Sequence, residues 1–272
     1  MKLKISLFTI CVATFLMAFK PQADNKAHKK AYKKFEKAFK NFSFIPGAAW
    51  QQPTDTTHPI STNWKSETVS VQSFFMQQYE VTNAEWHAFV AANSENRENL
   101  LPDTSLWEDT NEPMRRYYYS HPAFQNYPVV NISLAQAQAY CRWLAKEMTA
   151  SKDVLFDSVS VSIPTEMEWE YAARGGHDFN KYPWGGPYVR NAKGQFLANF
   201  LRVPEDEVRK VDGDLVLKKS IKNTLAASIP APIKVFYEND FGLYDMGGNV
   251  AEFVLPNQDG IHFTKGGSFY DP

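Results

Sequence analysis

The residues whose types and spacing best suit a chemical role lie in one glycine-rich stretch near the C-terminal end of the sequence. Residues 242–253 read GLYDMGGNVAEF and place two acidic side chains, Asp245 and Glu252, on either side of a glycine turn. Apolar residues flank the turn and anchor it in a defined backbone conformation. Two carboxylates around a glycine turn suit a hard cation, which prefers oxygen ligands. The stretch therefore predicts a turn that wraps a cation.

Three glutamates, Glu166, Glu168 and Glu170, form a second concentration of acid. Paired carboxylates can carry out acid–base chemistry. A structural interpretation explains the same residues more simply, because Thr165 and Glu168 have the spacing of a helix capping box and Arg174 can pair with the remaining acids. We favour the structural interpretation.

Cysteine and histidine, the residues most often found at catalytic centres, are sparse. The chain has two cysteines. Cys11 lies in an apolar N-terminal run, and Cys141 lies in a predicted helix, where a buried structural thiol is expected. The six histidines are scattered singly: His28, His58, His87, His121, His177 and His262. We assign no catalytic residue and no disulfide.

The elements that must position these residues belong to one large domain. With 272 residues, of which 44% are hydrophobic and 15% aromatic, the chain can bury a substantial core rich in aromatic rings. Helices are predicted over residues 81–92, capped by Thr82 or Asn83, and over 133–146, capped by Ser133. Residues 44–47 and 69–76 have the pattern of strands, and residues 200–232 that of a surface excursion or hairpin. The fold class is therefore α+β.

The first 23 residues have the features of a secretory signal peptide. A basic start leads into a short apolar run over residues 5–18, with cleavage expected after Ala18 or Ala23. The run is too short for a stable membrane span, so the mature chain is expected to be exported into the periplasm, the outer envelope or the medium. The net charge of −1 gives no reason to expect nucleic acid as a partner.

Residues 24–41 form a lysine-rich segment that predicts a basic helix leading into the domain. The functional interpretation is attachment to an anionic envelope surface or to a partner protein. The structural interpretation is a solvated lead-in, and we favour it at this point.

Eight blocks of sequence, in order, resemble the formylglycine-generating enzyme family, which includes the sulfatase-modifying factors. The resemblance runs from about residue 42 to residue 272 and is carried by these blocks: YEVTN (79–83), PVVNIS (128–133), AYCRW (139–143), IPTEMEWEYAARGG (163–176), YPWG (182–185), AN (198–199), NDFGLYDMGGNVAE (239–252) and GGS (266–268). It implies the family's variant of the C-type lectin fold, with little regular secondary structure and with structural calcium.

The resemblance also implies which residues bind metal. At the glycine turn the calcium ligands would be the Asp245 side chain, the carbonyls of Gly248 and Val250, and the Glu252 carboxylate. A second family site would use Asn199 and the carbonyl of the residue after it.

The family's catalytic centre has no counterpart in these residues. Members that make formylglycine oxidise a sulfatase cysteine with copper held by two cysteines just beyond the GGS block, and soft thiolates suit Cu(I). Here no cysteine follows Cys141 and the sequence stops at Pro272. The domain over residues 42–272 is therefore expected to lack its C-terminal end, and copper is expected only if a cysteine pair lies beyond it.

Two departures from the family pattern bear on function. The usual Asn-Val-Trp-Glu-Trp block becomes NVAEF over residues 249–253, and Arg-Leu-Pro-Thr becomes SIPT over 162–165. Blocks altered in this way, together with an export signal, resemble those of the non-catalytic relatives among the gliding-motility and type IX secretion lipoproteins of Bacteroidota. This chain lacks their lipidation cysteine.

Three functions remain open. The first is an exported, non-catalytic structural or binding component of the bacterial cell envelope, with a protein partner there. The second is a formylglycine-generating oxidase acting on a sulfatase peptide, with its cysteine segment missing. The third is a lectin-like binder with a cleft lined by Trp169, Trp184 and Tyr244.

Overall fold

The computed structural model describes ten parts of the chain: residues 14–15, 25–53, 66–107, 112–154, 158–177, 182–200, 208–211, 214–217, 229–256 and 264–271. Most of the proposed signal peptide lies outside these ranges. Its two described residues form β1 (Thr14–Phe15), which pairs with β5.

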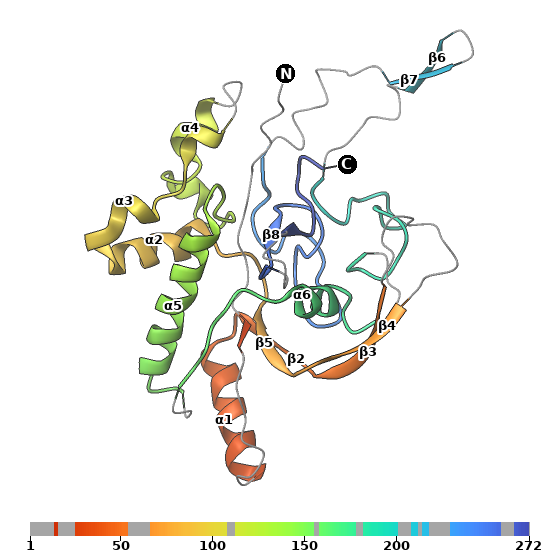
Figure 1. Cartoon of the computed structure of the whole chain (residues 1–272). Helices are drawn as coiled ribbons and strands as arrows, with labels where there is room; N and C mark the ends of the chain where they lie inside the picture. The colour runs from red at the N-terminus through yellow and green to blue at the C-terminus, as the bar shows by residue number, and fades with distance from the viewer. Residues whose placement is uncertain are drawn as a thin grey trace.

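Most of the helices gather on one side of the molecule (Figure 1). They are α2 (Asn83–Ala92), α3 (Arg97–Leu100), α4 (Glu112–Tyr117) and the long α5 (Leu134–Ala150), with short 3-10 turns η1 (Ser94–Asn96), η2 (Thr104–Leu106) and η4 (Pro122–Phe124) between them. Aromatic rings join α2 to α5, since Trp86 stacks on Tyr140 with the ring centroids 5.4 Å apart. The described helices confirm the two predicted from sequence, and α5 extends four residues further than expected.

Capping boxes explain why these helices begin where they do. Thr82 starts α2 and Ser133 starts α5, in each case accepting a backbone N–H through its hydroxyl while the residue three positions later reaches back. The same arrangement of Thr165 and Glu168 starts α6 (Glu166–Ala173), as predicted. Each box satisfies N–H groups that a helix start otherwise leaves without partners.

Short antiparallel strands make up the other side of the molecule. One sheet has the order β1, β5 (Phe74–Gln77), β2 (Phe42–Ile45), and a second pairs β3 (Ala48–Pro53) with β4 (Ser66–Val71). The single strand predicted over residues 69–76 is thus two strands. The chain breaks between them beside Gly47, where a side chain would come within 2.7 Å of the Ser73 nitrogen.

Two further strand pairs complete the fold. β8 (Glu252–Phe253) pairs with β9 (Thr264–Lys265) close to α6, and β6 (Val208–Val211) with β7 (Asp214–Leu217). The β6–β7 hairpin projects from the molecule (Figure 1) and is a described part of the surface excursion or hairpin predicted over residues 200–232, most of which lies outside the described residues.

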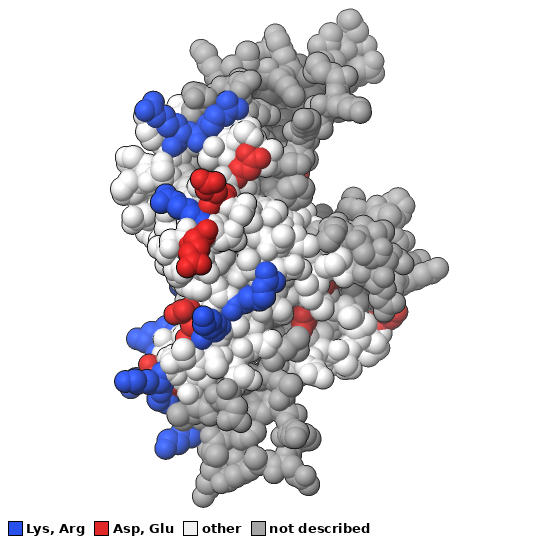
Figure 2. Space-filling model, turned by 60° about the vertical axis from the view of Figure 1, so that its left-hand side comes forward, with Lys and Arg blue, Asp and Glu red and all other residues white. Residues whose placement is uncertain are grey.

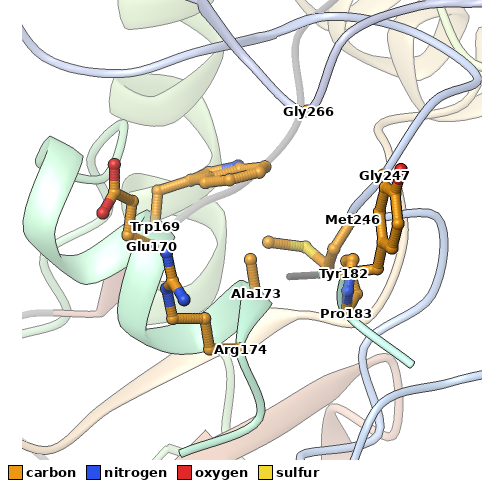
Figure 3. Close-up of a pocket in the computed structure, with 9 residues that line it drawn as sticks. All are labelled: Trp169, Glu170, Ala173, Arg174, Tyr182, Pro183, Met246, Gly247 and Gly266. Carbon is orange, nitrogen blue, oxygen red and sulfur yellow. The ribbon is translucent and has the colours of Figure 1, made fainter. Parts of the chain in front are cut away.

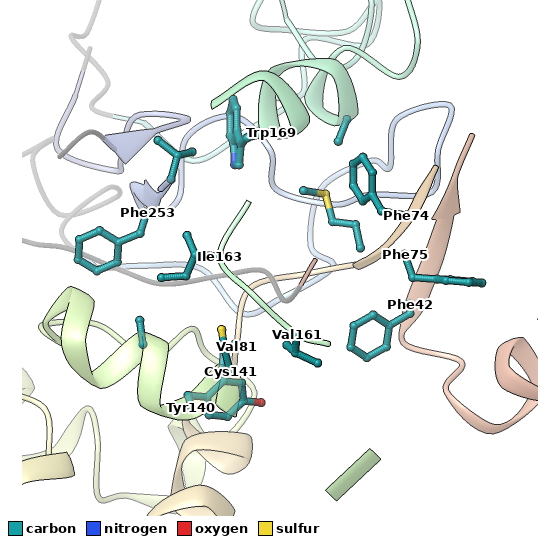
Figure 4. Packing of buried hydrophobic residues seen from close by; sticks show 14 of the residues in the cluster. Phe42, Phe74, Phe75, Val81, Tyr140, Cys141, Val161, Ile163, Trp169 and Phe253 are labelled. Carbon is teal, nitrogen blue, oxygen red and sulfur yellow. The ribbon is translucent and has the colours of Figure 1, made fainter. Parts of the chain in front are cut away.

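The hydrophobic core lies where these elements meet. Figure 4 shows side chains from the strands, α5 and α6 converging, among them Phe75, Cys141 and Trp169. A smaller cluster of Trp107, Tyr118, Val130, Val250 and Phe269 packs separately and joins the helical side to the C-terminal part of the chain. Burial of many large rings explains how a chain with so little regular structure holds together.

The basic segment forms α1 (Asn25–Ala38), which extends from the sheet at the lower end of the view in Figure 1. Phe35 anchors it, since this ring is fully buried and lies 4.8 Å from the ring of Phe75. The predicted basic helix is therefore present and fixed to the domain.

A buried acidic cluster and its asparagine hub

Three carboxyl groups from distant parts of the sequence are buried in the same region. Glu80 follows β5, Asp245 lies in the glycine-rich turn and Glu252 lies in β8. Their exposed fractions are 1%, 5% and 2%, respectively. Burying a charged carboxylate without a cation is costly, so the arrangement needs a physical explanation.

Asn249 is the hub of this region. Its side-chain amide donates to Glu80 Oε1 at 2.9 Å and to the Ala231 carbonyl at 3.3 Å. Its Oδ1 accepts from the Ala231 N–H at 2.7 Å and from Asn199 Nδ2 at 3.2 Å. The backbone N–H donates to the Asn199 carbonyl at 2.6 Å. Three chain segments, at Glu80, Asn199 and Ala231, are thus tied to the segment that carries Asn249, four segments in all.

Asp245 holds a neighbouring loop. One of its oxygens, Oδ2, accepts the backbone N–H of Lys234 at 3.0 Å. The other, Oδ1, is buried and has no hydrogen-bond partner, and the same is true of Glu80 Oε2. Asp245 and Lys234 both have positive φ, 56° and 61°. Left-handed backbone at two non-glycine residues marks a tightly determined turn.

Glu252 connects the cluster to α6. Its Oε2 accepts from the indole Nε1 of Trp169 at 2.6 Å. Trp169 lies on α6, the helix that the Thr165 capping box begins. This hydrogen bond therefore connects α6 to Glu252 in β8.

Burial controls the protonation of all three acids. It raises the pKa of Glu252 to about 8 and that of Asp245 to about 6, from ordinary values of 4.5 and 3.8. It also raises the pKa of Glu80 well above 4.5, and the charges of Asp245 and Glu252 push this pKa further up. The charge of Asp245 also raises the pKa of Glu252, because like charges repel in a poorly solvated region.

The other residues expected to bind calcium adjoin the same turn. Gly248 has φ of +78°, and a side chain there would come within 2.5 Å of the Asn199 carbonyl oxygen. Val250 is buried in the smaller hydrophobic cluster. Asn199 donates its amide to Ile229 O at 3.2 Å as well as to Asn249. The structure therefore brings Asn199 next to the glycine turn rather than leaving it at a separate place.

The carboxylate of Asp245 has a buried oxygen that is free to bind a cation. Asp245 Oδ1 lacks a donor, and mixed carboxylate and carbonyl oxygens are the groups that calcium prefers. Within the described residues no group of three or more His, Cys, Asp or Glu side chains is arranged as a metal site. A calcium ion here would rely on Asp245 and Glu252 with backbone carbonyls from Gly248 and Val250.

Glu80 and Asn249 were assigned no role from the sequence, although both lie in recognisable blocks. The available signal was local: Glu80 is a charged residue directly before the buried Val81 and Asn249 follows two glycines. Neither signal identifies the partner, because Glu80 and Asn249 are 169 residues apart.

Two adjoining cavities open beside the glycine turn. The larger, about 310 Å³, has Trp169 on one wall and Tyr182 and Pro183 on the other, with Met246 between them (Figure 3). The smaller, about 160 Å³, shares Tyr182, Gly247 and Gly266 with it and adds Trp184 and Ser268. The rings of Tyr182 and Trp184 stack 4.8 Å apart.

The cleft expected from Trp169, Trp184 and Tyr244 is only partly present. Trp169 and Trp184 line the two adjoining cavities. Tyr244 is not among the lining residues of either; its ring lies 5.3 Å from the Lys234 ammonium. Tyr182, which the sequence interpretation did not include in the cleft, takes the central position.

The glutamates of α6 have structural contacts. Glu168 is used by the capping box, and Lys265 Nζ lies 2.5 Å from Glu166 and 2.7 Å from Glu170. Arg174, the partner expected from sequence, lies over the ring of Trp50 at 5.8 Å. The ion pairs tie α6 to β9, which supports the structural interpretation of these acids.

Comparison with known proteins agrees with this geometry. A family model described as a sulfatase-modifying factor enzyme 1-like domain matches residues 28–272. The chain belongs to this family.

Curated members of the family include inactive and active proteins. The chain is 27% identical to the inactive C-alpha-formylglycine-generating enzyme 2 of Bos taurus, with 85% of this chain and 77% of that protein covered. It is 27% identical to the formylglycine-generating enzyme of Mus musculus over 68% of this chain and 50% of that enzyme. It is 25% identical to the enzyme of Thermomonospora curvata over 83% and 81%.

Solved structures support the fold. Treponema denticola variable protein 1 has a TM-score of 0.53 and 19% identity, with 85% of this chain and 84% of that chain covered. CarF has a TM-score of 0.50 and 20% identity, with 85% and 87% covered. At such low identity the likeness concerns the fold alone.

In this member of the sulfatase-modifying factor family, Cys141 is a core residue. It lies in α5 with an exposed fraction of 4%, and burial raises the pKa of its thiol to about 12. A thiol in this state is a poor nucleophile and a poor metal ligand, because both roles need the thiolate. The expectation of a buried structural thiol is confirmed.

Proposed function

We propose that this chain is an exported, non-catalytic member of the sulfatase-modifying factor family that serves as a structural or binding component of the bacterial cell envelope, of the gliding-motility or secretion type. The observation that carries the proposal is the match to relatives called inactive, which covers 85% and 84% of this chain. Within this sequence, Cys141 is the only cysteine outside the apolar N-terminal run, and it is buried.

The adjoining cavities beside the glycine turn are the surface that this function would use. Their walls combine exposed parts of aromatic rings with backbone at Gly247 and Gly266, where a bound chain can approach closely. Glu170 and Arg174 supply charges at the edge of the larger cavity. A partner protein's extended segment, with an apolar side chain in the larger cavity, fits these features.

A direct test of the non-catalytic proposal measures oxidation. The protein is loaded with Cu(I) and incubated with a cysteine-containing sulfatase peptide and oxygen, and the peptide is analysed by mass spectrometry. We expect no formylglycine, with an active family enzyme as the positive control. Formylglycine production would overturn the proposal and favour the oxidase alternative.

Cell fractionation tests the envelope role separately. We expect the protein in the envelope fraction, and a photo-crosslinking residue placed at Met246 in the larger cavity should capture one defined envelope protein. The same crosslinker at Tyr188, which is 75% exposed and lies outside both cavities, is the matched control. A protein found only in the cytosol would contradict the proposal.

Glycan binding is the second candidate. The stacked pair of Tyr182 and Trp184 favours it, because sugars pack on aromatic faces. Titration with oligosaccharides while Trp fluorescence is followed distinguishes the two: a saturable change that disappears in Trp184→Ala would support the glycan candidate over the peptide one.

Calcium is part of the proposal as a structural ion. Asp245, Glu252 and the carbonyls of Gly248 and Val250 would hold it, with Asn199 beside them, and the ion would neutralise buried charge without taking part in chemistry. We expect calcium to raise the melting temperature relative to chelator and Glu252→Gln to abolish the difference. Glu95→Gln, at an exposed residue, is the control. An unchanged melting temperature with and without chelator would remove calcium from the proposal.

A further inference from the structure

Helix α1 packs on the domain through Phe35. This residue is buried between three rings, with centroid distances of 4.7 Å to Phe39, 6.4 Å to Phe42 and 4.8 Å to Phe75. The Phe35 ring is therefore not available to insert into a bilayer or to pack on another protein.

A second contact fixes the orientation of the helix. Lys34 Nζ donates to the Lys152 carbonyl at 2.7 Å and lies 3.6 Å from Asp153 Oδ1, just after the end of α5. Together with the Phe35 ring contacts, this bond holds α1 at two points. The outer face of α1 is thus presented in a fixed direction rather than on a loose tail.

The outer face carries a row of lysines. Lys30, Lys33 and Lys37 lie roughly 140–160° around the helix from Phe35, given 3.6 residues per turn. Lys40 follows in the turn after the helix, and all four side chains are exposed. Among the described residues none of the four has an ion pair. Figure 2 shows basic side chains gathered along the lower left edge of the molecule, at the level of α1 in Figure 1.

The overall charge conceals a strong asymmetry. Residues 25–40 contain seven lysines and one glutamate, a net charge of +6, so the rest of the chain carries −7 to give the total of −1. A flat anionic surface would attract the α1 end and repel the body, which orients the molecule. The helix extends from the body at that end (Figure 1), so its lysines lie at one end of the molecule.

We propose that the row formed by Lys30, Lys33, Lys37 and Lys40, hereafter the lysine row, binds the anionic headgroups of a phospholipid membrane surface. Binding is electrostatic and peripheral, because Phe35, the ring that anchors α1, is buried against the sheet. The proposal rests on the envelope role proposed above and specifies its attachment.

The physical expectation is a steep dependence on lipid charge and on salt. Each lysine held near an anionic bilayer contributes about a fivefold increase in partitioning at low ionic strength. The effect falls within a Debye length, about 10 Å at 0.1 M salt. Four lysines acting together therefore give binding that is measurable at low salt and is lost as salt is raised.

The test is co-sedimentation of the full chain with vesicles of phosphatidylcholine alone and of phosphatidylcholine mixed with phosphatidylglycerol. The variant replaces the lysine row with glutamine: Lys30→Gln, Lys33→Gln, Lys37→Gln and Lys40→Gln. The matched control makes the same change in net charge at four exposed basic residues elsewhere: Arg116→Gln, Arg142→Gln, Lys146→Gln and Lys193→Gln. All three proteins keep the apolar N-terminal run, so its contribution is common to them.

We expect the unmodified protein to bind the anionic vesicles, the lysine-row variant to bind them more than tenfold less, and the control variant to differ by less than threefold. Equal losses in both variants, or equal binding to neutral vesicles, would overturn the proposal. Absence of vesicle binding combined with capture of duplex DNA or an acidic protein by the lysine row would overturn it too. Equal melting temperatures of the three proteins show that folding is intact. The readout is lipid binding, so failure here leaves the oxidation and fractionation tests unaffected.

Discussion

At the scale of single residues, the Asn249 side chain makes more hydrogen bonds to other chain segments than Asp245 or Glu252, the two acids predicted as ligands. Its backbone has φ of 58°, a conformation that asparagine adopts more readily than most residues. Its amide offers both a donor and an acceptor, and Glu80, Ala231 and Asn199 need one or the other. An aspartate would add a charge next to Glu80, and a leucine would leave several buried groups without partners.

Replacing Asn249 tests the hub. Asn249→Ala is expected to lower the free energy of unfolding by about 3 kcal/mol, because a buried polar group left without its partner costs about 1–3 kcal/mol and at least two are affected. Asn249→Gly keeps the left-handed backbone accessible, so an equal loss in this variant assigns the effect to the side chain. Urea unfolding measures both.

The matched control for the hub is Asn99→Ala, at an exposed asparagine that bonds to Asn96. It is expected to change the free energy of unfolding by less than about 0.5 kcal/mol. If Asn249→Ala were as mild as the control, the hydrogen bonds around Asn249 would not be what holds the four segments together.

Cys141 gives a second prediction at this scale. Since burial raises the pKa of its thiol to about 12, iodoacetamide is expected to leave it unlabelled in the folded protein and to label it fully in urea. The measurement is intact-mass spectrometry in a Cys11→Ser background, so that only one thiol is present. Rapid labelling without urea would show that the thiol is accessible and would weaken the non-catalytic proposal.

At the scale of elements, local sequence signals predicted the helices well. Thr82, Ser133 and Thr165 each begin a helix because a hydroxyl followed three residues later by a glutamate or glutamine specifies a helix start by itself. The division of residues 69–76 into β4 and β5 was missed, because the two strands pair with different strands, β3 and β2, which lie earlier in the sequence.

Helix α1 is predicted to undock as a unit when its anchor is removed. Phe35→Ala deletes a ring buried among three others, a change that costs roughly 3–5 kcal/mol of packing. Because α1 lies at one end of the molecule, the loss is expected to fall on the helix while the rest of the fold persists. Limited trypsin digestion should then cleave rapidly within residues 25–40.

The control for this variant is Phe44→Ala. Phe44 lies in β2, is 41% exposed and contacts Phe75 from the neighbouring strand. It is expected to leave the cleavage rate within α1 nearly unchanged. An equal rate in both variants, or a general loss of protease resistance in Phe35→Ala, would show that α1 is not a separately docked element.

At the scale of the whole molecule, the site was only half predictable. The glycine turn supplied Asp245 and Glu252 because the ligand pattern lies within eight consecutive residues. Glu80 and Trp169 were invisible as partners, since they lie 169 and 83 residues from Asn249 and Glu252, the residues that they contact. Contacts formed across the whole chain have no short sequence spacing to reveal them.

The same cluster makes global stability depend on pH in a direction opposite to that of carboxylates whose pKa is lowered by ion pairs or hydrogen bonds. Raised pKa values mean that the folded state holds protons which the unfolded state releases. The free energy of unfolding therefore falls as pH rises, between 4.5 and about 8 for Glu252 and between 3.8 and about 6 for Asp245. Below pH 4.5 for Glu252 and 3.8 for Asp245, the folded and unfolded states both hold the proton, so the free energy of unfolding no longer depends on pH through these groups.

A bound cation reverses this dependence, because it favours the charged carboxylates that burial alone disfavours. With chelator present, the melting temperature is expected to fall steadily from pH 5 to pH 8, the range that the Glu252 shift spans. With calcium present, the fall is expected to flatten or to become a rise, since calcium binds more tightly as the acids lose their protons. Glu252→Gln removes the Glu252 part of the dependence in chelator, because the amide does not titrate and still accepts from Trp169. Parallel pH profiles with and without calcium would mean that the ion does not bind at this cluster, and a flat profile in chelator would mean that the three acids are better solvated than their burial implies.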